Sequence, residues 1–76
     1  MNVKVLGGGC SKCETLLSNV KEAVASTGAD ADIEYITDFA VIGSYGIMST
    51  PALMIDDRIV SVGRVLKSSE IEKLLR

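Results

Sequence analysis

The feature that most constrains the fold of this chain is a long amphipathic segment, flanked on each side by a short segment that contains β-branched residues. Over residues 11–27 the apolar positions recur at intervals of three and four, which predicts a helix that Gly28 can end. Residues 2–6 and 32–36 are rich in valine, isoleucine and tyrosine, and each predicts a strand. A strand, a helix of this length and a second strand form a βαβ unit, so we expect the two strands to be parallel.

The middle of the chain predicts a short helix and a hairpin. Asp38 can cap a helix over residues 39–45 with its side-chain oxygen. Two apolar runs, 52–55 and 58–62, are separated by Asp56–Asp57, which is the spacing of a two-residue hairpin turn. We therefore expect two antiparallel strands in this part of the chain.

The end of the chain predicts a last helix. Ser69 and Glu72 match a capping box, in which each side chain satisfies a backbone N–H group of the other residue. Ile71, Leu74 and Leu75 then fall on one apolar face of that helix. The predicted elements come in the order βαβαββα, which indicates an α/β fold in a single domain that covers all 76 residues.

The charge and the hydropathy of the chain argue against nucleic-acid and membrane partners. The chain has 8 basic and 10 acidic residues, a net charge of −2, and no basic cluster, so we expect no nucleic-acid partner. No apolar run approaches the roughly 18 residues of a membrane span, and the first residues lack the apolar core of a secretory signal. We therefore expect a soluble, cytoplasmic monomer with no membrane partner.

Both cysteines of the chain lie where the first predicted strand gives way to the first predicted helix. Cys10 and Cys13 come after three glycines and are three positions apart, so in a helix they face each other on neighbouring turns. The free N–H groups and the positive dipole end of a helix N-terminus favour a thiolate, so we expect Cys10 to be exposed and the more reactive sulfur. Lys12 would lower the pKa of Cys10 further if its side chain turns inward, although a lysine in the first turn of a helix is more often simply solvated. In a compartment that keeps thiols reduced, such a pair is more often catalytic or metal-binding than structural.

The chain holds three aromatic residues, Tyr35, Phe39 and Tyr45. Large aromatic side chains bury much apolar surface when they pack. We therefore expect all three in the core or at its rim rather than in a substrate-binding surface.

The chain resembles the thioredoxin/glutaredoxin superfamily in two motifs and in the elements predicted after them. The first motif is Cys10-Ser11-Lys12-Cys13, and the second runs from Tyr45 to Leu53 and contains Thr50-Pro51. A strand pair and a final helix complete the pattern, which is most similar to that of small, single-domain thioredoxin-like redox-active disulfide proteins. The resemblance implies a minimal thioredoxin fold: a four-stranded mixed sheet with helices on both faces and the hairpin antiparallel to the first strand.

The resemblance also implies roles for individual residues. The Cys10 thiolate would attack a substrate disulfide and Cys13 would resolve the mixed disulfide, leaving a Cys10–Cys13 bond. The Thr50–Pro51 peptide bond would be cis and lie against the Cys10 sulfur, with the Thr50 backbone pairing with the substrate, and Ser49 is a further candidate substrate contact. The partners implied are protein disulfides and an unidentified disulfide reductase or small thiol, with no cofactor.

The chain departs from typical family members in three places. Gly9 stands where thioredoxins have a tryptophan, and Ser11-Lys12 stands where they have Gly-Pro between the cysteines. The glutathione-binding signature of glutaredoxins is also not matched, since Gly63 is followed by Arg64. The redox potential and the use of glutathione therefore do not carry over to this chain.

A soft-metal module is the alternative hypothesis. The sequence Gly9-Cys10-Ser11-Lys12-Cys13 after a first strand is also similar to heavy-metal-associated domains, whose paired cysteines bind copper(I). Those domains have the element order βαββαβ and carry no Thr-Pro motif. Zinc would need two further ligands, and the chain has no histidine and no third cysteine. An iron–sulfur cluster held between two chains is a minor variant of this hypothesis.

Overall fold

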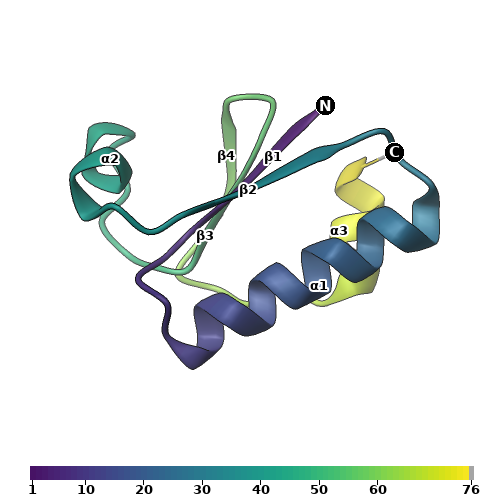
Figure 1. Ribbon diagram of the computed structural model, residues 1–76, viewed down its shortest axis with the longest axis horizontal. Coiled ribbons are helices and arrows are strands. Elements are labelled where there is room, and N and C mark those ends of the chain that lie inside the picture. Colours follow the sequence, from purple (N-terminus) through teal and green to yellow (C-terminus); the bar gives the residue numbers. More distant parts are fainter. Residues whose placement is uncertain (76) are drawn as a thin grey trace.

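Four strands and three helices occur in the order that the sequence predicts (Figure 1). The computed structural model describes residues 1–75. All four strands and the long helix have the predicted bounds, because turn-forming residues or breaks in apolar periodicity mark each of their ends. The elements are β1 (Asn2–Leu6), α1 (Ser11–Thr27), β2 (Asp32–Ile36), α2 (Phe39–Ser44), β3 (Ala52–Ile55), β4 (Arg58–Val62) and α3 (Ser68–Leu75).

The strands form one mixed sheet in the order β2-β1-β3-β4. β1 and β2 are parallel, with Val5 opposite Tyr35, as the βαβ unit predicts. β1 and β3 are antiparallel, with Leu6 opposite Ala52, and β3 and β4 form the antiparallel hairpin. β1 therefore lies between β2 and β3, and the segment after Leu6 leaves the sheet between the ends of these two strands.

The sheet carries an apolar cluster on each face, because side chains alternate along β1 and β3. α1 and α3 pack against each other over the first cluster, and α2 contributes to the second cluster at one end of the opposite face (Figure 1). The mixed sheet with helices on both faces that the resemblance implies is thus confirmed. The first cluster contains Val3, Val5, Leu16, Val20, Ala23, Leu53, Ile55, Leu66, Ile71 and Leu75, and the second contains Leu6, Ile42, Ile47, Ala52 and Met54.

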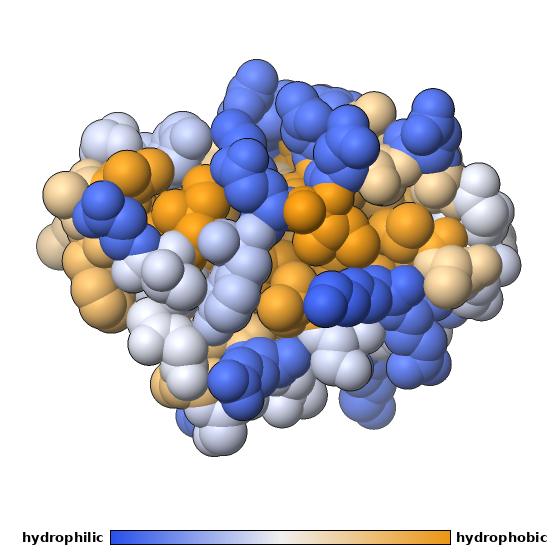
Figure 2. Space-filling view, in the orientation of Figure 1, coloured by the Kyte–Doolittle hydropathy of each residue, from blue (hydrophilic) through white to orange (hydrophobic). Residues whose placement is uncertain are grey.

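The three helices leave part of the apolar side chains uncovered. Figure 2 shows apolar residues at the surface between groups of charged ones. A chain of this length has a large surface relative to its volume, so some apolar exposure is expected. The most exposed large apolar side chains are those of Met48, 94 % exposed, and Phe39, 65 % exposed. In the part of the chain that the structure describes, no helix is long and apolar enough to cross a membrane.

The predicted turns and caps in the first half of the chain are formed. Gly28 adopts the left-handed conformation (φ 66°), and its N–H donates to the Val24 carbonyl at 3.0 Å, which ends α1. Asp38 Oδ1 accepts a hydrogen bond from the Ala40 N–H at 2.9 Å at the start of α2. α2 is one residue shorter than predicted, since Tyr45 comes after its last turn as the C-cap.

The N-terminal cap of α3 differs from the prediction. The carbonyl of Lys67 accepts from the N–H groups of Glu70 and Ile71 at 3.0 and 3.1 Å, so Lys67 caps the helix. Its own N–H donates to Glu70 Oε1 at 3.2 Å, which is the reciprocal half of a capping box. The capping box predicted at Ser69 and Glu72 is therefore wrong, because Glu70 takes the acidic position.

Contacts of Leu66 hold the chain in place just before this cap. Its side chain is buried in the first cluster, and its carbonyl accepts from Asn19 Nδ2 at 2.9 Å. The chain is thus held against α1 immediately before Lys67, and the helix begins from that fixed point. Leu74, predicted on the same face as the buried Ile71, is 41 % exposed, so the predicted apolar face is only partly covered.

Candidate functional site

The segment from Gly7 to Cys13, called here the cysteine turn, brings the two thiols together. Gly9 has a φ of 81°, a conformation that glycine adopts without a steric cost, and it turns the chain out of β1. Cys10 is then the N-cap of α1, and its Sγ accepts from the Cys13 N–H at 3.3 Å. The two Sγ atoms are 2.7 Å apart, with Cys10 exposed and Cys13 fully buried. The facing thiols that the spacing predicts are therefore present at the start of the helix.

The two thiols differ in their electrostatic surroundings. The hydrogen bond from the Cys13 side chain, and after it the one from the Cys13 N–H, lowers the pKa of Cys10 below its ordinary value. Burial, and after it the hydrogen bond to Cys10, raises the pKa of Cys13. As the pH rises, Cys10 therefore ionises while Cys13 still holds its proton. The thiolate is the nucleophilic form of a cysteine, and the lowered pKa favours this form at the exposed sulfur.

Gly7 and Gly8 in the cysteine turn lie so close to side chains of other residues that a Cβ atom would not fit at either position. A Cβ on Gly7 would overlap Cys13 Sγ, so the backbone of Gly7 forms the wall against which this sulfur is held. A Cβ on Gly8 would lie 2.5 Å from Phe39 Cζ, so the tip of that ring rests on the turn. The Gly7 N–H donates to the Ile36 carbonyl at 3.0 Å and ties the turn to the end of β2.

The Thr50–Pro51 segment lies at the same end of the sheet. The antiparallel register sets Leu6 opposite Ala52, and one further step along it places Pro51 beside Gly7. The Thr50–Pro51 peptide bond is cis, Pro51 is fully buried and Thr50 is half-buried. The segment therefore enters β3 directly beside the cysteine turn.

Ser49 and Lys12 lie at the surface around this end of the sheet. The Ser49 side chain is exposed, and a Cβ on Gly63 would lie 3.4 Å from its Cβ, so Ser49 packs beside the segment after β4. The Gly63 N–H donates to the Pro51 carbonyl at 2.8 Å and holds the two segments together. Lys12 is exposed on the first turn of α1. The structure thus gathers both cysteines and residues 49–51 at one end of the molecule, with Lys12 on its surface.

Phe39 contributes to this site in a way that the sequence predictions missed. Its ring is not packed in the core but is 65 % exposed beside Gly8. Tyr45, by contrast, is half-buried against the second cluster, as expected, and the Lys4 ammonium lies 5.3 Å from its ring centre. The position of Phe39 depends on how α2 meets the turn, which no local pattern reveals.

Tyr35 is a second aromatic residue near the cysteine turn. It packs against the first cluster from the position before the last in β2. Its hydroxyl is buried and has no hydrogen-bond partner among the described residues. Burial raises the pKa of Tyr35, and the neighbouring Cys13 raises it further. Strand alternation with Ile33 predicts the face that this side chain takes, but not that the hydroxyl reaches the turn.

The soft-metal hypothesis gains no support from the arrangement. Among residues 1–75, no three cysteine, aspartate or glutamate side chains are grouped to hold a metal ion. A tetrahedral zinc site would thus lack ligands from this part of the chain. The element order βαβαββα also differs from the βαββαβ order of heavy-metal-associated domains.

Comparison with known proteins shows similarity along the whole chain. Residues 1–76 match the family model described as a thioredoxin domain. A protein named thioredoxin from Methanothermobacter thermautotrophicus is 36 % identical over 75 residues, covering 99 % of this chain and 97 % of the relative. A protein named thioredoxin from Methanocaldococcus jannaschii is 36 % identical over 74 residues, covering 97 % of this chain and 85 % of the relative. The fold and these matches agree, and the chain belongs to the thioredoxin domain family.

Proposed function

We propose that this protein is a thiol–disulfide oxidoreductase in which Cys10 is the nucleophile and Cys13 the resolving cysteine. The observation that carries the proposal is the asymmetry of the pair, an exposed thiol at a helix N-cap hydrogen-bonded to a buried one. The opposite pKa shifts of the two thiols support this order of attack. The relatives named thioredoxin support the class of reaction.

The reaction has two exchange steps. The Cys10 thiolate attacks one sulfur of a substrate disulfide, so that a Cys10–substrate bond forms while the other substrate sulfur leaves as a thiolate and takes up a proton. Cys13 then loses its proton, and its thiolate attacks Cys10 Sγ and expels the second substrate thiolate. The substrate gains two electrons, and the protein dithiol becomes the Cys10–Cys13 disulfide. The 2.7 Å between the two sulfurs leaves Cys13 little distance to travel for the second attack.

The surrounding residues are proposed to hold the substrate. The Thr50–Pro51 segment lies beside the cysteine turn, which supports the proposal that the Thr50 backbone pairs with an extended substrate chain carrying the attacked sulfur. Ser49, exposed next to it, would contact the same chain, and Lys12 would favour the Cys10 thiolate by its charge. The partners are protein disulfides on one side and a disulfide reductase or small thiol, which returns the electrons, on the other.

The test combines turnover with cysteine reactivity. The wild-type protein should accelerate the reduction of insulin by dithiothreitol, and iodoacetamide should alkylate Cys10 first, with a pKa below the ordinary value of about 8.5. Cys10→Ser should abolish turnover. Cys13→Ser should still complete the first step and accumulate a mixed disulfide that mass spectrometry detects.

A matched control is Ser18→Ala, because Ser18 is exposed on α1 outside the site. This variant should behave as the wild type in both assays. A wild-type protein that leaves insulin reduction unchanged, or in which Cys13 is alkylated before Cys10, contradicts the proposal.

A further inference from the structure

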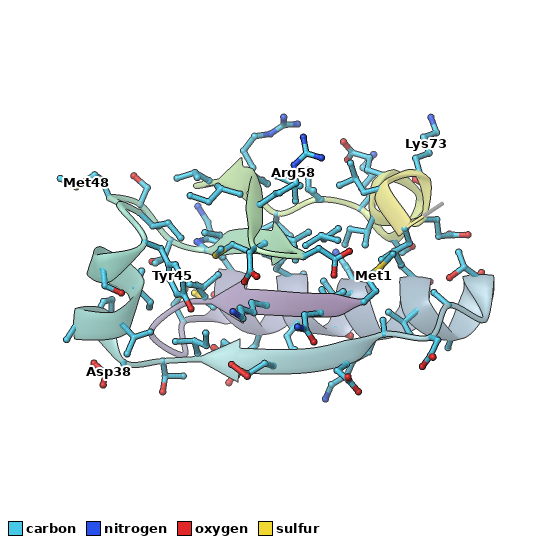
Figure 3. All side chains as sticks on the ribbon, turned by 90° about the horizontal axis from the view of Figure 1, so that it is seen from above. Met1, Asp38, Tyr45, Met48, Arg58 and Lys73 are labelled. Atoms are coloured by element: carbon cyan, nitrogen blue, oxygen red, sulfur yellow. The ribbon has the colours of Figure 1, made fainter. Side chains whose placement is uncertain are left out.

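Phe39 lies beside the cysteine turn although it belongs to α2. It is the first residue of that helix, and the Asp38 cap before it holds the start of the helix in place. Figure 3 shows Asp38 at the α2 end of the sheet, away from Met1 and Lys73. A Cβ on Gly8 would lie 2.5 Å from Phe39 Cζ and 3.0 Å from Cε2, so the outer edge of the ring touches the backbone two residues before the cysteine pair.

The Phe39 ring is held against the cysteine turn, but most of it is exposed to solvent. It rests on the bare backbone of Gly8 and belongs to neither apolar cluster of the sheet. With 65 % of Phe39 exposed, most of its apolar surface faces water. A polar side chain at this place would cost the fold little, so the packing of this chain does not account for an aromatic residue here. The ring is therefore an exposed apolar surface on the cysteine turn, which also carries the exposed Cys10.

The topology puts the ring on one side of the cysteine turn and Pro51 on the other. The turn leaves the sheet between β2 and β3. Pro51 immediately precedes β3, whereas Phe39 comes three residues after β2. The Gly7–Gly8 part of the turn, two residues before the exposed Cys10, thus lies between the Pro51 segment and an exposed aromatic ring. A substrate chain bonded to Cys10 through its own cysteine carries its neighbouring side chains toward one or the other.

We propose that the Phe39 ring is a docking platform that selects disulfides with an apolar or aromatic residue beside the attacked cysteine. The inference rests on the proposed function, since it requires Cys10 to attack disulfides. Such a neighbour removes its own surface and that of the ring from water, which we expect to favour the reaction by about tenfold. A polar neighbour gains nothing from the ring, so Phe39 acts as a specificity-determining residue.

The experiment uses two disulfide-linked peptide dimers and one small disulfide. The monomers are Gly-Phe-Cys-Phe-Gly and Gly-Ser-Cys-Ser-Gly with blocked ends, and the small disulfide is bis(2-hydroxyethyl) disulfide. The second-order rate constant for reduction of each peptide by the reduced protein is divided by that for the small disulfide, which removes differences in the intrinsic reactivity of Cys10. For the wild type we expect this ratio to be about tenfold higher for the phenylalanine peptide than for the serine peptide.

Phe39→Ala should lower the ratio for the phenylalanine peptide to that for the serine peptide, whereas Phe39→Tyr should retain the preference. Val41→Ala is the matched control, because Val41 is 37 % exposed on the same helix, and the preference should remain.

The outcomes separate the two proposals. A wild-type protein without a preference for the phenylalanine peptide overturns the platform, whatever the variants do. The platform is also overturned if Phe39→Ala slows all three disulfides by the same factor, since the ring then only shapes the turn. A wild-type protein that reduces none of the three disulfides overturns the proposed function and the platform with it.

Discussion

At the scale of single residues, Gly7 controls where the Cys13 sulfur lies. The backbone of Gly7 occupies the space next to Cys13 Sγ, and its N–H is tied to the Ile36 carbonyl, so the wall cannot move away easily. Cys13 in turn supplies the hydrogen bond that is the main cause of the lowered pKa of Cys10. A residue with no side chain thus acts on the exposed thiol through the buried one.

Gly7→Ala should destabilise the protein and weaken the activation of Cys10. The added methyl group overlaps Cys13 Sγ, and we expect the overpacking to lower the free energy of unfolding by about 1–3 kcal/mol. Displacement of Cys13 should also raise the pKa of Cys10 toward its ordinary value, because the hydrogen bond from Cys13 is lost. Urea denaturation and the pH profile of iodoacetamide alkylation measure the two effects.

Gly43→Ala is the control for this substitution. Gly43 lies in α2 and a Cβ there would meet no atom within 4 Å, so alanine should raise the free energy of unfolding by about 0.5–1 kcal/mol. Equal stabilities for the two alanine variants would contradict the close packing at Gly7.

The sequence predicts some site residues well and others poorly, for a physical reason. The facing of Cys10 and Cys13 is a consequence of local helix geometry, so their spacing predicts it. Phe39 and Tyr35 reach the same turn from different elements, and their approach depends on how the whole sheet assembles. Within its own segment each of these two residues has the pattern of a core-packing residue, so the local sequence does not reveal its place at the turn.

At the scale of elements, the turn between β3 and β4 shows how an exposed connection can hold the sheet. Asp56 and Asp57 both have positive φ, 49° and 64°, a conformation that aspartate tolerates better than most residues. The Asp56 side chain accepts from the Asn2 N–H at 2.8 Å, and Asp57 pairs with the Lys4 ammonium at 3.2 Å. Both aspartates therefore tie the hairpin to β1.

Asp56→Ala should lower the free energy of unfolding by about 1–2 kcal/mol. Alanine bears the steric cost of the left-handed conformation, and the acceptor for the Asn2 N–H is lost. Asparagine also tolerates a positive φ and keeps an acceptor oxygen, so the stability of Asp56→Asn should remain close to that of the wild type. Thermal or urea denaturation compares them, and an alanine variant as stable as the asparagine variant would show that the turn contributes nothing.

Element boundaries were predictable wherever a local signal was decisive. Gly28 ends α1 because glycine alone adopts its φ at no cost, and the aspartate pair sets the hairpin spacing. The N-terminal cap of α3 was not predictable in the same way. There Lys67 and Glu70 form the cap, because Leu66 is held in the core against α1, and this contact joins segments far apart in the sequence.

At the scale of the whole molecule, the two thiols couple stability to pH in opposite directions. Cys10 has a lowered pKa, so between that pKa and the ordinary value of about 8.5 the unfolded chain binds more protons, and stability rises with pH. Cys13 has a raised pKa, so above the ordinary value the native protein binds more protons, and stability falls. The reduced protein should therefore gain stability up to about pH 8.5 and lose it above.

Two cysteine variants separate the rise of stability with pH from its fall. The measurement is the free energy of unfolding of the reduced protein in urea, from about pH 6 to about pH 9.5. Cys10→Ser should remove the rise and keep the fall, because burial is the main cause of the raised pKa of Cys13. Cys13→Ala should remove the fall and most of the rise, because the Cys13 side chain is the main cause of the lowered pKa of Cys10. A wild-type profile that both variants reproduce would show that neither thiol is linked to folding.

The short distance between the two sulfurs also bears on oxidative damage. A peroxide that oxidises Cys10 produces a sulfenic acid, which further peroxide converts to sulfinic and sulfonic acids that thiols do not reduce. With Cys13 Sγ 2.7 Å away, the sulfenic acid can instead condense with the second thiol, lose water and give a disulfide. That disulfide is reversible, so the arrangement proposed to release a substrate would also protect the exposed sulfur from permanent loss.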